Sequence, residues 1–153
     1  MLRLFTFIFV IGFLACNSEN KKTETKTDSQ QSLADSLENE VMDGHDVGMS
    51  KYGKLKSMKF EAERLLDSIS KLPAKAREAA EPLKIKLDAL VRDLGEAKDG
   101  MDKWMREFDM DSAVNDTKAR IDYLTSEKLK VGKVKESILQ TLQRADSLLR
   151  KNL

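Results

Sequence analysis

The sequence predicts an all-α protein, with an elongated, coiled-coil-like, up-down-up bundle of three helices over residues 32–153. Apolar residues recur at steps of three and four through most of this range, which is the spacing of one face of an α-helix. Prolines and a short Asp-, Asn- and Ser-rich stretch divide the pattern into three long segments, and no segment shows the alternation typical of a strand. One apolar face per helix is what a bundle with a shared core requires.

The first predicted helix begins near Ser32 and ends before Pro73. Ser32 and Asp35 fit a capping pattern, in which the Ser oxygen accepts a hydrogen bond from an N–H of the first turn. The apolar positions of this helix are Leu33, Leu37, Val41, Met49, Tyr52, Leu55, Met58, Ala62, Leu65, Ile69 and Leu72. Gly44, Gly48 and Gly53 weaken its middle, because each glycine costs about 1 kcal/mol relative to alanine. The helix could bend there, or the glycines could let a neighbouring helix approach closely.

The second predicted helix follows a short lead-in over residues 73–81 and ends near Phe108, with Pro82 at its first turn or at a kink. Its apolar stripe is Leu83, Leu87, Leu90, Val91, Leu94, Ala97, Met101, Trp104, Met105 and Phe108. After a turn at residues 109–116, whose polar residues suit an N-cap, the third stripe is Ile121, Leu124, Val131, Val134, Ile138, Leu142, Ala145, Leu148 and Leu149. A pair of long helices that dimerises as a coiled coil is the alternative. The proline breaks and the third stripe favour the monomeric bundle.

The first fifteen residues have the pattern of a secretory signal peptide. Arg3 supplies the positive start, and an uncharged run, LFTFIFVIGFLA, ends at the small residue Ala15. The run is shorter than the ~20 apolar residues that a membrane-spanning helix needs. Cys16 follows directly and resembles the acylated cysteine of a bacterial lipoprotein, although Phe13 and Leu14 depart from the usual residues of that signal. An ordinary signal peptide with an incidental cysteine is the alternative.

Residues 17–31 (NSENKKTETKTDSQQ) contain no aliphatic or aromatic side chain. Such a segment cannot bury apolar surface, so residues 16–31 are predicted to be a lipidated cysteine followed by a disordered tether. The tether would hold the bundle off a membrane of the cell envelope, with the outer membrane favoured.

Composition argues against several functions. Removal of residues 1–15 takes away only Arg3 among the charged residues, which leaves 26 basic and 26 acidic residues, so net charge gives no support for binding nucleic acid. A G-x-x-x-x-G-K stretch at 48–54 is followed by Leu55 instead of the Ser or Thr of a phosphate-binding loop, so no nucleotide is expected. The single cysteine excludes an intramolecular disulfide. Without a recognisable catalytic motif, the sequence predicts a non-enzymatic protein that needs no cofactor.

Two groups of soft side chains are predicted to meet at one end of the bundle, one from the first helix and one from the second. They are Met42, His45, Met49, Met101 and Met105. Thioether and imidazole groups suit Cu(I), so a periplasmic Cu(I)-binding protein is the alternative function. Methionines more often fill irregular core space, here around Trp104, and the sequence favours that interpretation.

Ser112 is a candidate for glycosylation. Asp-Ser followed by an apolar residue occurs four times and resembles the O-glycosylation acceptor motif of Bacteroidota. Only Ser112 lies in a predicted loop, where an exposed side chain could be modified.

Two segments carry a family resemblance. Residues 40–53 (EVMDGHDVGMSKYG) resemble an E-V-M-x-x-H-D-x-x-M-x-K-x-G pattern of small helical lipoproteins of the Bacteroidota, and residues 100–108 (GMDKWMREF) are similar to the M-x-x-W-M-x-x-F motif of the same family. These proteins are often labelled "viral A-type inclusion protein", a label that reflects coiled-coil similarity. The resemblance implies an all-helical envelope lipoprotein and no catalytic residues. We therefore expect a lipid-anchored structural or protein-interaction module.

Overall fold

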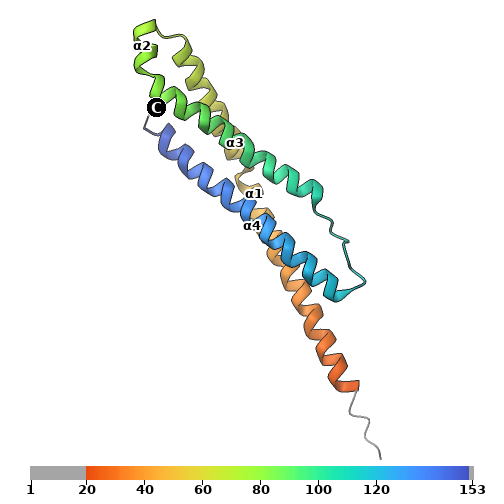
Figure 1. The fold of residues 1–153 in the computed structure, drawn as a ribbon. Coiled ribbons are helices and arrows are strands. Elements are labelled where there is room, and N and C mark those ends of the chain that lie inside the picture. The colour runs from red at the N-terminus through yellow and green to blue at the C-terminus, as the bar shows by residue number, and fades with distance from the viewer. Residues whose placement is uncertain (1–19, 152–153) are drawn as a thin grey trace, which may run out of the picture.

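A computed structural model describes residues 20–151, and all regular structure in that part of the chain is helical. The helices are α1 (Asn20–Ser70), α2 (Ala74–Ala79), α3 (Glu81–Glu107) and α4 (Thr117–Leu149). Figure 1 shows α1, α3 and α4 packed along one another, with α2 in the connection between α1 and α3. α3 runs back along α1, and α4 runs in the direction of α1, so the predicted up-down-up three-helix bundle is confirmed.

The core is built on a seven-residue repeat. Six buried positions of α1 follow one another at this interval: Ala34, Val41, Gly48, Leu55, Ala62 and Ile69. The same interval separates the buried residues Leu87, Leu94 and Met101 of α3, and Leu124, Val131, Ile138 and Ala145 of α4. A sustained seven-residue repeat keeps one seam of each helix against its neighbours by left-handed supercoiling. The bundle is therefore coiled-coil-like, as the apolar stripes predicted.

The start of α1 differs from the prediction. The helix begins at Asn20, so Ser32 lies inside the helix instead of capping it, and the part of the expected tether from Asn20 to Gln31 is helical. This stretch contains Lys, Glu and Gln, which favour helix, and neither Gly nor Pro. Adding residues to a helix that already exists in the bundle costs little free energy, so the segment from Asn20 to Gln31 can be helical without an apolar face of its own. Figure 1 shows this end of α1 continuing past the α3–α4 connection.

The prolines lie at helix boundaries. α1 ends at Ser70, before Pro73, and the expected lead-in is the short helix α2. Pro82 lies in the first turn of α3, where its missing N–H leaves no intrahelical hydrogen bond unmade. The structure thus selects the first of the two predicted roles for Pro82, a helix start and not a kink.

Gly44 and Gly48 allow close approach of the other two helices. A Cβ atom on Gly44 would lie 2.9 Å from Cγ1 of Val131 in α4, and one on Gly48 would lie 2.2 Å from Cε of Met101 in α3. α1 runs through both glycines without interruption. Of the two predicted consequences, close packing is confirmed at Gly44 and Gly48. It is not found at Gly53, where an added Cβ atom would meet nothing within 4 Å.

The α3–α4 connection is tied to the start of α4. The Asp116 side chain accepts a hydrogen bond from the Ala119 N–H at 3.0 Å, which confirms the predicted N-cap chemistry. The Tyr123 hydroxyl accepts a hydrogen bond from the Asp109 N–H at 2.7 Å. Ala113 adopts a φ of 58°, a conformation that costs a non-glycine residue about 1–2 kcal/mol and that these tertiary contacts offset.

Candidate functional site

The predicted Met/His cluster lies where α1 passes the end of α3. The His45 ring is 5.8 Å from the Trp104 indole, centroid to centroid, so the two groups of side chains do meet at this end of the bundle. Met101 is fully buried against Gly48, and Met49 packs on the edge of the core. Met42 is half-buried, whereas Met105 is 37% exposed.

His45 begins a row of rings that crosses the bundle. Trp104 stacks on Phe108 with ring centroids 4.9 Å apart, and Phe108 stacks on Tyr123 at 6.1 Å. The Nδ1 atom of His45 lies 2.9 Å from Oδ1 of Asp46, its neighbour in the chain. The row joins α1, α3, the following connection and α4, and such aromatic contacts stabilise a core beyond the area they bury.

Glu127 is a buried carboxylate that the sequence pattern did not lead us to expect. Its Oε2 accepts a hydrogen bond from Nε1 of Trp104 at 2.9 Å, and its Oε1 lies 2.7 Å from Nζ of Lys130. The hydrogen bond with Glu127 raises the pKa of Lys130 above its usual value. The signal was present: Glu127 lies three residues after Leu124 and four before Val131, within the buried stripe of α4.

Arg120 is a second buried charged group at this end. Its guanidinium donates to Oε2 of Glu38 at 2.8 Å and to the backbone oxygen of Ser112 at 2.9 Å. Within the described part of the chain, every buried side-chain nitrogen and oxygen has a hydrogen-bond partner. No three His, Cys, Asp or Glu side chains among residues 20–151 converge as metal ligands would. His45 contacts Trp104 and Met101 packs against Gly48, and Cu(I) binding by the methionines and His45 stays a hypothesis.

The G-x-x-x-x-G-K stretch is helical and holds α1 against α3. The Tyr52 hydroxyl donates a hydrogen bond to Asp102 at 2.8 Å, and Nζ of Lys98 donates to the same carboxylate at 2.6 Å. The Lys98 hydrogen bond, followed by that of Tyr52, holds the pKa of Asp102 below its usual value. The pKa of Asp102 is therefore lower in the folded than in the unfolded protein. Its ion pair stabilises the fold at neutral pH, and this stabilisation is lost as the pH falls through the folded-state pKa of Asp102.

Copper binding can be tested directly at these residues. If they are core, Met101→Leu and Met49→Leu should each change the free energy of unfolding by less than about 1.5 kcal/mol, because volume is nearly conserved. Added Cu(I) should leave the melting temperature of the wild type unchanged. A saturable rise at one equivalent of Cu(I), absent from His45→Ala and the Met→Leu variants, would establish the metal site instead.

Of the two predicted modification sites, Ser112 lies within the described residues and Cys16 does not. Ser112 lies in the α3–α4 connection, as predicted, and is half-buried, with its backbone oxygen held by Arg120. Its glycosylation stays a prediction. Cys16 and the signal segment lie outside the described residues. None of the helices within residues 20–151 is long and apolar enough to cross a membrane.

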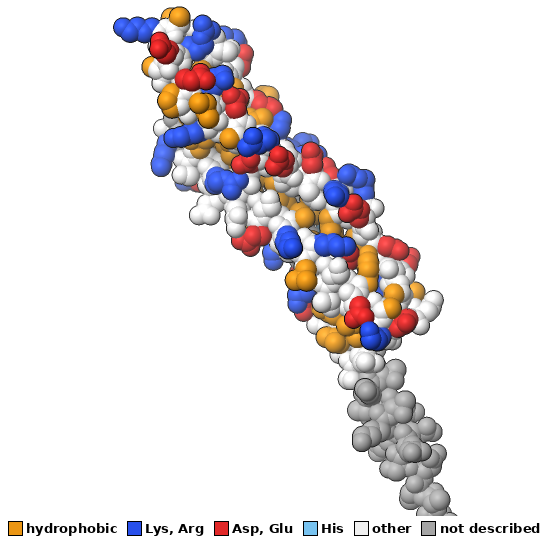
Figure 2. All heavy atoms as spheres, viewed as in Figure 1, with side chains coloured by type: hydrophobic (Ala, Val, Ile, Leu, Met, Phe, Trp, Pro, Cys, Tyr) orange, Lys and Arg blue, Asp and Glu red, His pale blue; other side chains and the backbone are white. Residues whose placement is uncertain are grey.

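A groove follows the side of the bundle between α3 and α4. It consists of two hollows of about 580 and 260 Å³, and Arg144 lines both. A third hollow of about 520 Å³ is lined by residues of α4 alone, Arg144 among them. The hollow nearest α2 is lined by Ala79, Pro82, Leu83, Lys86, Arg144, Ser147, Leu148 and Lys151. In the space-filling view, hydrophobic side chains lie among charged ones on the face turned to the viewer near the end that carries α2 (Figure 2).

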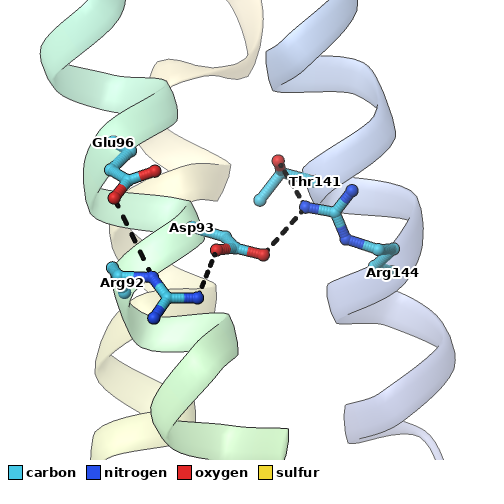
Figure 3. Close-up of polar contacts among 5 residues, drawn as sticks. All are labelled: Arg92, Asp93, Glu96, Thr141 and Arg144. Atoms are coloured by element: carbon cyan, nitrogen blue, oxygen red, sulfur yellow. Dashed lines mark hydrogen bonds and ion pairs between the residues drawn. The ribbon is translucent and has the colours of Figure 1, made fainter.

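Arg144 is held in place across the groove. Figure 3 shows its side chain reaching from α4 to Asp93 of α3, with Nη2 3.0 Å from Oδ2 of Asp93 and 3.2 Å from Oγ1 of Thr141. Asp93 is also paired with Arg92 at 3.5 Å, and Arg92 lies 3.9 Å from Glu96. The Asp93 carboxylate is therefore shared between two guanidinium groups.

The sequence carried no signal for this groove. Lys86 and Arg144 belong to helices that are separated by the whole α3–α4 connection, and each taken alone resembles an ordinary solvated charge. Only the antiparallel pairing of α3 and α4 brings them to one hollow.

Comparison with known proteins adds no assignment. No protein-family model, no curated protein and no solved structure matches this chain.

Proposed function

We propose that this protein is a lipid-anchored, non-enzymatic component of a bacterial cell envelope that holds a protein-interaction surface on a stiff helical rod. The apolar leader and Cys16 support the anchor. The resemblance of residues 40–53 and 100–108 to helical lipoproteins supports the same assignment.

The continuity of α1 is the observation that carries the proposal. The helix begins four residues after Cys16 and runs for 51 residues through the whole bundle. At 1.5 Å per residue its length is about 75 Å. A lipid on Cys16 would lie four residues from the start of this helix, and the helical part of the link would define the position of the bundle relative to the membrane more narrowly than a flexible tether of the same residues.

The groove lies far from the anchor along this rod. A Cβ atom on Gly95 would lie 3.7 Å from Cε of Lys59, and Asp93, two residues before Gly95, bonds Arg144. Arg144 is therefore about level with Lys59 of α1, and the rise from Asn20 to Lys59 is about 60 Å. A membrane-anchored protein with this geometry would present the α3–α4 groove well clear of the lipid headgroups.

Replacement of Cys16 tests the anchor. The Cys16→Ser variant should be released from membranes or remain as an uncut precursor, because stable attachment needs several acyl chains, each contributing about 0.8 kcal/mol per buried CH₂. The wild type and the Ser18→Ala control should both fractionate with membranes and be extracted by detergent. A Cys16→Ser protein that is cut after Ala15 and still fractionates with membranes would contradict the proposal.

A further inference from the structure

We draw no further inference here: the strongest candidate, the hollow that Lys86, Arg144 and Lys151 line between α3 and α4 beside α2, carries none, because Arg144 is already paired with Asp93 and nothing in the structure shows what covers this face.

Discussion

Leu94→Asp should lower the free energy of unfolding by about 3–5 kcal/mol, enough to unfold much of the protein at ambient temperature. Leu94 is 1% exposed and belongs to the seven-residue seam of α3, between Leu87 and Met101. The one buried cation among the described residues, Arg120, is already bonded to Glu38, so folding would bury an uncompensated carboxylate or require its protonation. Urea titration followed by circular dichroism measures the change.

Ile85→Asp is the matched control for this variant. Ile85 lies on the same helix but is 60% exposed, so the same chemical change should alter stability by no more than about 0.5 kcal/mol. If the two variants unfold at the same urea concentration, the register of α3 in the bundle is wrong.

Trp104→Ala should cost about 3–5 kcal/mol, the range observed for deleting a large buried aromatic side chain. The indole packs between His45 and Phe108, and its Nε1 donates a hydrogen bond to the buried Glu127. The substitution therefore leaves a cavity and removes one of the two partners of a buried carboxylate. The comparison is with Phe60→Ala, at an aromatic residue that is 68% exposed, which should stay within about 0.5 kcal/mol of the wild type.

Trp104→Phe separates the hydrogen bond from the packing. The phenyl ring keeps most of the stack but cannot donate, so this variant should lose about 1–3 kcal/mol. Adding Glu127→Leu to Trp104→Phe should cost less than Glu127→Leu costs alone, because Trp104 no longer loses its acceptor. Strictly additive free energies would show that the Trp104–Glu127 pair is not formed in solution.

The buried residues of a helix could be predicted from its apolar stripe wherever both neighbouring helices cover that stripe. In α3 the predicted positions Leu87, Leu90, Leu94, Ala97, Met101 and Trp104 are all buried. Leu33, Leu72 and Met105 belonged to the predicted stripes but are each more than a third exposed. Periodicity identifies a helix face, but the length over which that face is covered depends on where the neighbouring helices end.

The early start of α1 and the polar part of the core were harder to predict for a different reason. The residues from Asn20 onward are helical because they continue a packed helix, and the apolar content of the segment itself does not predict this. Arg120, Glu127 and Thr141 are buried because specific partners satisfy them, and two of those partners, Glu38 and Trp104, come from other helices. Pairing across the fold follows only once the register of the helices is known.

The groove depends on the same register. Its cations come from α3 and from α4, and Arg144 acquires its place through Asp93 on the opposite wall. The apolar stripe of a helix predicts which of its residues face the core. A surface formed by two helices depends in addition on how the helices are rotated relative to each other.

The lipid anchor on Cys16 is the central claim, and mass spectrometry of the N-terminal peptide of the protein purified from bacterial membranes tests it most directly. The account predicts a peptide that begins at Cys16, lacks residues 1–15 and carries covalent acyl chains. A peptide that retains residues 1–15, or one that begins at Cys16 with an unmodified thiol and amino group, would contradict it.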